Sequence, residues 1–297
     1  DLLHPDDLYD RPRFSDGRVD FGAVINWKLG MLDRSFHRFK NTHSPKLKAE
    51  YKQFWLQQAS WLEDFSLFMA LKEAHGGAPW HTWEVPLRKR FPDALAAARQ
   101  KLDVAIQRQV YRQFIFFRQW QHLHSYAHDK GIQIIGDVPI FVAHDSADVW
   151  VNPKLFFLDE GGKPSVVAGV PPDYFSPTGQ LWGNPLYRWE VHTANGYAWW
   201  LARIQAVLQM VDIIRIDHFR GFAGYYEVPG DALTAEHGRW VSAPGKDFFN
   251  TMRQVLGDLP ILAEDLGVIT ADVEDLRDSF DLPGMRIFQF AFGSGPA

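Results

Sequence analysis

The segment Ile214-Arg215-Ile216-Asp217 alternates apolar and charged side chains. In an extended chain, successive side chains point to opposite faces, so Arg215 and Asp217 would share one face. A guanidinium beside a carboxylate favours the ionised carboxylate, and a nucleophilic carboxylate must be ionised. We therefore expect Asp217 to be a nucleophile that Arg215 keeps charged. A structural ion pair beneath a loop is the alternative that this pattern leaves open.

The segment Ala263-Glu264-Asp265-Leu266-Gly267 places two carboxylates side by side, and in an extended chain only one of them can face the side of Asp217. Two carboxylates about 5 to 5.5 Å apart across a sugar bond are the requirement for retaining glycoside chemistry. We expect Glu264 to be the second carboxylate, kept protonated by the nearby negative charge and able to donate to the leaving oxygen. In the alternative interpretation, Asp265 caps the N-terminus of a following helix.

Bringing these side chains together requires a parallel sheet. Short apolar runs that end in polar residues occur along the second half of the chain, at 132–137, 211–217, 260–265 and 285–290. Such runs are typical of parallel strands. Helical patterns at 197–209 and 246–256 lie between them, and strands that alternate with helices indicate an α/β fold.

Asp137, Asp217 and Glu264 each lie at the carboxyl end of one apolar run, which is where barrel enzymes place their chemistry. We therefore expect an α/β fold of the (β/α)8 TIM barrel type that is incomplete in this chain, with about four of its eight strands. An open four-stranded sheet is the alternative that periodicity alone allows.

The first 130 residues have a different pattern, without alternating strands. A helix is predicted at 46–73, between Ser44-Pro45 and the helix-ending Gly76-Gly77 and Pro79. A second is predicted at 92–130, where apolar residues lie three or four positions apart. We expect a mostly helical subdomain over 1–130, inserted in the barrel, and a partial catalytic barrel over 131–297. The second region would carry an aromatic loop at 169–187.

Composition excludes several classes of function. The net charge is −5 and Lys and Arg form no long run, so we expect no nucleic-acid partner. The absence of cysteine excludes disulfides and thiolate metal sites and suits a cytoplasmic location. Apolar runs of about 18 residues are lacking, so we expect no membrane partner. The 12 Trp, 23 Phe and 9 Tyr include rings that could cover the apolar faces of sugars.

Longer motifs surround the candidate carboxylates, and they follow one another in the order typical of a single family. One of them begins Gly136-Asp137-Val138-Pro139-Ile140-Phe141. Together they resemble the 4-α-glucanotransferases of glycoside hydrolase family 77, also called amylomaltases or disproportionating enzymes, over nearly the whole chain. The segments that carry this resemblance are 65–73, 76–80, 136–150, 169–176, 179–187, 214–222 and 263–267.

The resemblance implies a role for each residue of the carboxylate site. Asp217 would form a covalent glycosyl-enzyme intermediate, and Glu264 would act first as the general acid and then as the base. Arg215 would orient Asp217, while Asp137 and His218 would hold hydroxyl groups of the transferred glucose. The alternatives are a hydrogen-bonded loop residue for Asp137 and a satisfied buried histidine for His218.

The resemblance also implies that the aromatic loop at 169–187 covers the cleft. Its flat side chains would meet the faces of sugars, and Pro171-Pro172 would lower the cost of ordering it. A loop that packs on the barrel is the alternative. The substrate-binding residues that it would supply are Asp173, Tyr174, Phe175, Trp182 and Asn184.

By the same resemblance, the protein would transfer α-1,4-glucan segments between maltooligosaccharides or starch-type glucans by a retaining double displacement, with no cofactor and no metal. An α-amylase-like glycoside hydrolase and a non-catalytic glucan-binding fragment are alternatives. A metal-dependent hydrolase would use His122-Leu123-His124, but neighbours two positions apart diverge on a helix.

The chain departs from the family in one respect. A third carboxylate of the family lies in a His-Asp-Asn motif on the next strand, and this motif is absent from the sequence. The opening strands of the family are also missing. We therefore expect the sequence to be a fragment that is cut at both ends.

Overall fold

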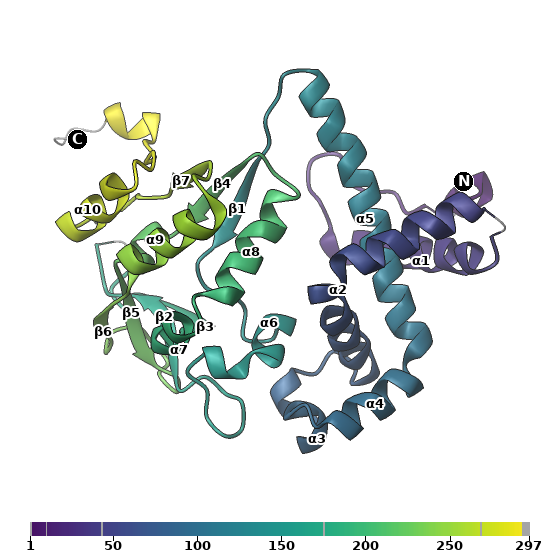
Figure 1. Ribbon diagram of the computed structural model, residues 1–297, viewed down its shortest axis with the longest axis horizontal. Coiled ribbons are helices and arrows are strands. Elements are labelled where there is room, and N and C mark those ends of the chain that lie inside the picture. Colours follow the sequence, from purple (N-terminus) through teal and green to yellow (C-terminus); the bar gives the residue numbers. More distant parts are fainter. Residues whose placement is uncertain (1, 10, 43, 175, 268, 293–297) are drawn as a thin grey trace. The chain divides into compact units, whose positions relative to one another are not determined.

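The computed structural model describes residues 2–9, 11–42, 44–174, 176–267 and 269–292. The chain divides into two compact units (Figure 1). One unit contains Asp1–Ala78 and Val85–Trp120, and the other contains Pro79–Glu84 and Gln121–Ala297.

The first unit is helical, as its sequence pattern predicts. Its helices are α1 (Phe21–Lys40), α2 (Pro45–Ala74), α3 (Val85–Arg88), α4 (Pro92–Lys101) and most of α5 (Asp103–Asp129), after a short 3-10 helix η1 (Pro5–Leu8). The side chain of Ser44 caps α2 by accepting a hydrogen bond from the backbone N–H of Leu47. Aromatic and aliphatic side chains from α1, α2 and α5 form the core: Phe36, Phe39, Phe54, Leu62, Val110, Tyr111 and Phe114.

The helical stretch expected at 92–130 consists of two helices. Helix α4 ends at Lys101, where the N–H of Leu102 still donates to the carbonyl of Ala98, and α5 begins at Asp103. Gly131 follows α5 with a positive φ of 69°. This left-handed conformation is favourable for glycine and ends the helix.

The second unit contains a parallel sheet of three strands in the order β1 (Ile135–Pro139), β4 (Ile213–Asp217) and β7 (Ile261–Ala263). Asp137 pairs with Arg215 in the register of β1 and β4. Helix α8 (Ala198–Leu208) packs against β4 (Figure 1). The unit also contains α6 (Ala147–Val151), α7 (Trp189–Ala194), α9 (Gly245–Leu256), α10 (Ala271–Ser279) and the 3-10 helices η2 (Trp80–Thr82), η3 (Pro153–Leu155) and η4 (Phe219–Phe222).

A separate antiparallel sheet has the strand order β3 (Gln180–Pro185), β2 (Val166–Val170), β5 (Gly224–Pro229) and β6 (Arg239–Ser242). The expectation of a loop over 169–187 is therefore wrong for part of this segment, which includes the end of β2 and all of β3. Backbone pairing with β2 holds β3 in place at the edge of the sheet.

The prediction of a strand at 285–290 is also wrong. Residues 281–287 form no regular element, and the 3-10 helix η5 (Phe288–Phe292) follows. The backbone N–H of Met285 donates to Oδ1 of Asp265 at 2.7 Å, so this donor is not available to a strand ladder. The result is a mixed α/β fold with three parallel strands among the described residues.

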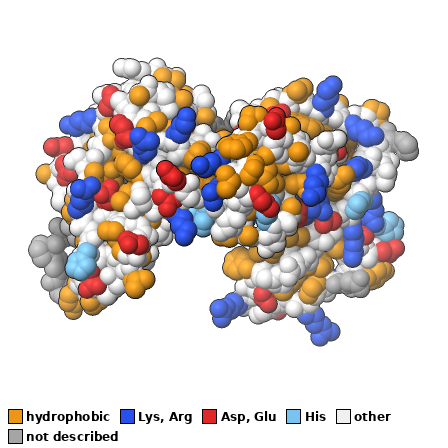
Figure 2. All heavy atoms as spheres, turned by 90° about the horizontal axis from the view of Figure 1, so that it is seen from below, with side chains coloured by type: hydrophobic (Ala, Val, Ile, Leu, Met, Phe, Trp, Pro, Cys, Tyr) orange, Lys and Arg blue, Asp and Glu red, His pale blue; other side chains and the backbone are white. Residues whose placement is uncertain are grey.

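The face drawn in Figure 2 has mixed charge. On the face in Figure 2, Lys and Arg side chains are interspersed with Asp and Glu side chains. In the part of the chain that the structure describes, every helix is too short or too polar to cross a membrane.

Candidate active site

Arg215 lies between two carboxylates, that of Asp137 at the centre of β1 and that of Asp217 at the carboxyl end of β4. Its Nη2 donates to Oδ2 of Asp137 at 2.8 Å and to Oδ1 of Asp217 at 3.0 Å. The hydrogen bond with Asp137 raises the pKa of Arg215 above its usual value, so the guanidinium is charged. The side chains of Asp137 and Asp217 are 54% and 43% exposed. A charged, partly buried donor therefore fixes two carboxylates that an incoming ligand can still reach.

The alternation of β4 explains this arrangement. Ile214 and Ile216 are buried, whereas Arg215 and Asp217 on the opposite face are partly exposed. The same face of β1 carries Asp137, because Asp137 and Arg215 are partners in the parallel register. The sequence prediction that Arg215 and Asp217 share a face is confirmed by their hydrogen bond.

Glu264 follows β7 and lies beside the end of β4. Its backbone N–H donates to the carbonyl of Ile216 at 3.0 Å, and its carbonyl accepts from the N–H of Phe219 at 3.1 Å. Its carboxylate accepts two more backbone hydrogen bonds, from His218 to Oε2 at 2.9 Å and from Leu266 to Oε1 at 3.0 Å. A protonated Glu264 can keep both of these bonds, because a carboxyl oxygen that carries a proton donates to a ligand and still accepts.

Asp265, the residue after Glu264, is buried and paired with an arginine, which indicates a structural role. Its side chain is 1% exposed and accepts from Nη1 of Arg277 at 2.5 Å. Burial alone would raise the pKa of Asp265, but the hydrogen bonds from Met285 and Arg277 hold it below the usual value. The alternative in which Asp265 caps a helix is wrong, because Thr270 is the residue that precedes α10.

His218 directly follows β4, and its backbone N–H bonds to Glu264, the residue that follows β7. It has a positive φ of 54°, a backbone conformation that costs a non-glycine residue about 1 to 3 kcal/mol. Burial lowers the pKa of its imidazole to about 4, so the ring is neutral near pH 7. Its ring centroid lies 4.7 Å from that of Trp182, at an angle of 80°. A neutral imidazole can both donate to and accept from a sugar hydroxyl.

The other predicted substrate residues have different surroundings. Nδ2 of Asn184 donates to the carbonyl of Val142 at 2.9 Å, which holds β3 against the segment after β1. Asp173 accepts from the N–H of Ser176 at 2.7 Å and so stabilises its own turn. Tyr174 is 96% exposed and Trp182 is 38% exposed. Phe175 lies outside the described residues.

A possible metal-binding group lies away from these carboxylates. Among the described residues, His124, His128 and Asp212 have ligand atoms close enough to share an ion. The sequence prediction considered His122 with His124 and missed His128 and Asp212. The available signal was the four-residue spacing of His124 and His128, which places two side chains on one face of a helix.

Comparison with known proteins identifies similar chains. The family described as 4-alpha-glucanotransferase matches residues 2–297. The chain is 52% identical over 284 residues to the 4-alpha-glucanotransferase of Thermus thermophilus, covering 96% of this chain and 57% of that protein. It is 50% identical over 295 residues to the 4-alpha-glucanotransferase of Synechocystis, covering 99% of this chain and 58% of that protein.

A solved structure is also similar. The amylomaltase of Streptococcus agalactiae, in complex with acarbose, superposes with a TM-score of 0.93 at 41% identity, covering 99% of this chain and 59% of that one. This chain thus spans somewhat more than half the length of the relatives that it matches.

Proposed function

The chain belongs to the 4-alpha-glucanotransferase family, glycoside hydrolase family 77, and from this premise we propose that its protein transfers α-1,4-glucan segments between maltooligosaccharides or starch-type glucans. Asp217 attacks the anomeric carbon of the donor while Glu264 protonates the leaving oxygen. Glu264 then deprotonates the hydroxyl of an acceptor glucan, which displaces Asp217. Two displacements retain the α configuration.

The observation that carries this proposal is the position of Arg215 between Asp137 and Asp217, with Glu264 at the end of the next strand. A nucleophile must be ionised and oriented before a donor binds, and a fixed guanidinium does both. Asp137 and the neutral His218 then offer hydrogen bonds to hydroxyl groups of the glucose that is transferred.

The antiparallel sheet supplies the remaining substrate contacts that we propose. Trp182 on β3 lies against His218. Its ring is therefore available to a sugar that binds to His218. We assign Tyr174 and Phe175 to further sugar contacts and Asp173 and Asn184 to the support of the segment that carries them.

We extend the proposal to the architecture and the conditions of the reaction. The three parallel strands would belong to a (β/α)8 barrel, with residues 1–130 as a helical insertion. The reaction would need no cofactor, and its location would be the cytoplasm, although the similar protein of Solanum tuberosum is named chloroplastic/amyloplastic.

Covalent trapping tests the proposal. A fluorinated α-glucosyl fluoride should label the intact protein once, and peptide mass spectrometry should place the label on Asp217. The exposed Asp231 on the turn after β5 provides the control: Asp231→Asn should still be labelled, and Asp217→Asn should not. A label on another carboxylate would refute the assignment. Incubation with maltotriose should yield both longer and shorter glucans, and mostly glucose and maltose would indicate a hydrolase instead.

A further inference from the structure

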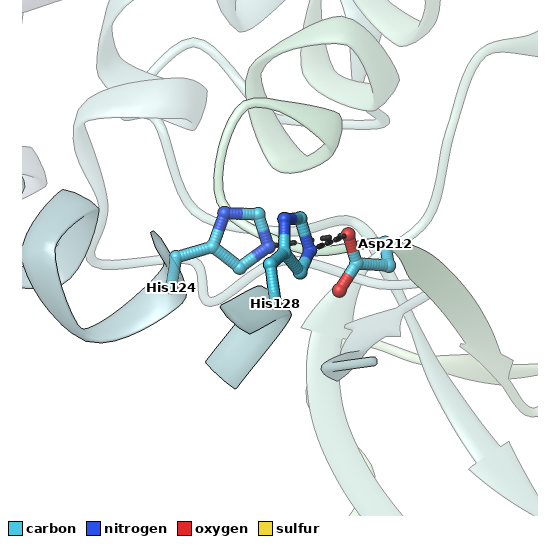
Figure 3. A group of neighbouring side chains, drawn as sticks. All are labelled: His124, His128 and Asp212. Carbon is cyan, nitrogen blue, oxygen red and sulfur yellow. Dashed lines mark hydrogen bonds and ion pairs between the residues drawn. The ribbon is translucent and has the colours of Figure 1, made fainter. Parts of the chain in front are cut away.

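Three side chains far from Asp217 converge where α5 ends and β4 begins. His124 and His128 lie in the last turns of α5, and Asp212 directly precedes β4. Figure 3 shows both imidazoles directed at the carboxylate of Asp212. Nε2 of His124 lies 3.2 Å and Nε2 of His128 lies 2.7 Å from the same oxygen, Oδ1. The three possible ligand atoms all lie within 4.8 Å of one another.

The backbone holds these side chains in place. Residues four positions apart on a helix share a face, and the ring centroids of His124 and His128 are 4.2 Å apart. Asp212 is fixed by a double contact with Ile134: its N–H donates to the carbonyl of Ile134 at 2.9 Å, and its Oδ2 accepts from the N–H of Ile134 at 2.7 Å. One carboxylate oxygen therefore faces the backbone, and the other faces the imidazoles.

One nitrogen in this group makes an ion-pair contact with Asp212 but no well-aligned hydrogen bond. Nε2 of His124 is excluded from solvent and, despite its distance of 3.2 Å from Oδ1, makes no hydrogen bond of acceptable geometry with the described residues. Buried polar atoms without a partner are rare in folded proteins, and a bound ion can satisfy such an atom. A cation between the three side chains would accept the lone pair of this nitrogen.

We propose that His124, His128 and Asp212 form a binding site for a divalent transition-metal ion, with Zn²⁺ as the best match. Two imidazole nitrogens and one carboxylate oxygen are ligands that Zn²⁺ uses, with water in a fourth position. Metal–ligand bonds of about 2.0 to 2.2 Å in a tetrahedron place the ligand atoms about 3.3 Å apart. The separation of 3.2 Å at His124 already fits this geometry, and that of 2.7 Å at His128 has to widen by only about half an ångström.

The hydrogen bond from Ile134 completes the arrangement. Carboxylates that bind metals are commonly oriented by a hydrogen bond to their other oxygen, which is the role of the Ile134 N–H toward Oδ2. The site lies at the amino ends of β1 and β4, whereas Asp217 is the last residue of β4 and Asp137 is the central residue of β1. A bound ion would therefore join the end of α5 to the parallel sheet and stabilise the fold without entering the reaction.

Calorimetric titration of the intact protein with Zn²⁺ tests this site. The protein should carry no histidine tag and should first be stripped with EDTA. One ion should bind per chain, and His124→Gln, His128→Gln and Asp212→Asn should each weaken binding at least about tenfold, since losing even a residue that hydrogen-bonds to a metal ligand costs about 10- to 100-fold. His122→Gln is the matched control, because His122 lies on the same helix and is exposed; it should bind Zn²⁺ like the wild type.

Thermal unfolding supplies a second measurement. At about a hundredfold excess over Kd, Zn²⁺ should raise Tm by roughly 5 °C or more in the wild type and in His122→Gln, and this increase should disappear in His124→Gln. Absence of Zn²⁺ binding at millimolar concentrations, or unchanged binding in both His124→Gln and His128→Gln, would overturn the proposal. These two variants keep the test decisive if Asp212→Asn fails to fold. Displacement of Zn²⁺ by Mg²⁺ would also overturn it, because Mg²⁺ prefers oxygen ligands.

Discussion

The backbone N–H of His218, the residue that follows Asp217, donates a hydrogen bond of 2.9 Å to Oε2 of Glu264. The peptide that follows the proposed nucleophile Asp217 therefore holds the carboxylate of the proposed acid, Glu264. His218 makes this bond from a left-handed backbone conformation, with φ of 54°. Strain at this residue is offset by a hydrogen bond that joins the ends of two strands.

The proposed acid role of Glu264 predicts a dependence on the leaving group. Glu264→Gln should reduce kcat about 10²- to 10⁴-fold with a maltooligosaccharide donor, because general acid catalysis contributes that much. With an α-maltosyl fluoride donor, whose leaving group needs little protonation, formation of the intermediate should slow far less. Pre-steady-state kinetics with the two donors would measure the difference. Glu274→Gln, at an exposed position on α10, should leave both rates unchanged, and equal losses with both donors would show that Glu264 is not the acid.

Trp182 is predicted to decide between transfer and hydrolysis. An acceptor glucan competes with a large excess of water, and it succeeds only if the protein holds it close to the intermediate. Stacking of a sugar on the Trp182 ring should contribute about 1 to 3 kcal/mol to acceptor binding, by analogy with the stacking of bases on aromatic rings. Trp182→Ala removes this contact and should therefore raise the ratio of hydrolysis to transfer about tenfold. Glucose release and chain-length analysis measure this ratio.

Trp240→Ala is the control for Trp182→Ala, because Trp240 is 47% exposed and lies on β6, at the other edge of the same sheet. It should leave the ratio unchanged. If Trp182→Ala lowers total activity at a constant ratio, Trp182 supports the fold and does not bind the acceptor.

Much of the second unit was predictable because single strands carry local patterns. The alternation of Ile214, Arg215, Ile216 and Asp217 appears in the structure as alternate buried and partly exposed residues. The antiparallel sheet was missed, because β3 contains Gly183, Asn184 and Pro185, which are uncommon in strands. The aromatic and β-branched residues of β5 (Gly224–Pro229), by contrast, are typical of a strand.

The error in predicting a strand at 285–290 has a non-local cause. The alternating residues of this segment fit a strand, but the backbone N–H of Met285 donates to the buried carboxylate of Asp265. Asp265 lies 20 residues earlier in the sequence. No local pattern contains that contact. The metal-binding group was missed for a related reason, since Asp212 lies 84 residues from His128 in the sequence.

Gly284 is predicted to be intolerant of a side chain. A Cβ at this position would lie within 2.9 Å of Oδ1 of Asp265, whose side chain is 1% exposed and cannot move freely. Gly284→Ala should therefore destabilise the fold by about 1 to 3 kcal/mol, the usual cost of overpacking. Gly30→Ala is the control, because a Cβ at Gly30 in α1 meets no atom within 4 Å; it should stabilise by up to about 1 kcal/mol. Urea unfolding measures both, and equal effects would contradict the prediction.

The buried His192 should lower the free energy of unfolding in acid. It is fully buried, and burial lowers its pKa to about 4, below the value of about 6.5 in an unfolded chain. The folded state therefore excludes the proton: stability is complete above pH 6.5 and falls as the pH drops toward 4. The loss is at most roughly 3 kcal/mol. His192→Gln should flatten the dependence of the free energy of unfolding on pH between 7 and 4, and the exposed His122→Gln should not.

The pairing of Arg215 with both Asp137 and Asp217 leaves a surplus of acidic groups. Even with Glu264 protonated as the proposed acid, the two carboxylates of Asp137 and Asp217 outnumber the single guanidinium between them. The local electrostatic potential is therefore negative, which favours the positive charge that develops on a sugar as its glycosidic bond breaks. The same potential repels anions. Glucans that carry phosphate esters should therefore bind more weakly than neutral glucans of the same length, and added salt should narrow that difference by screening.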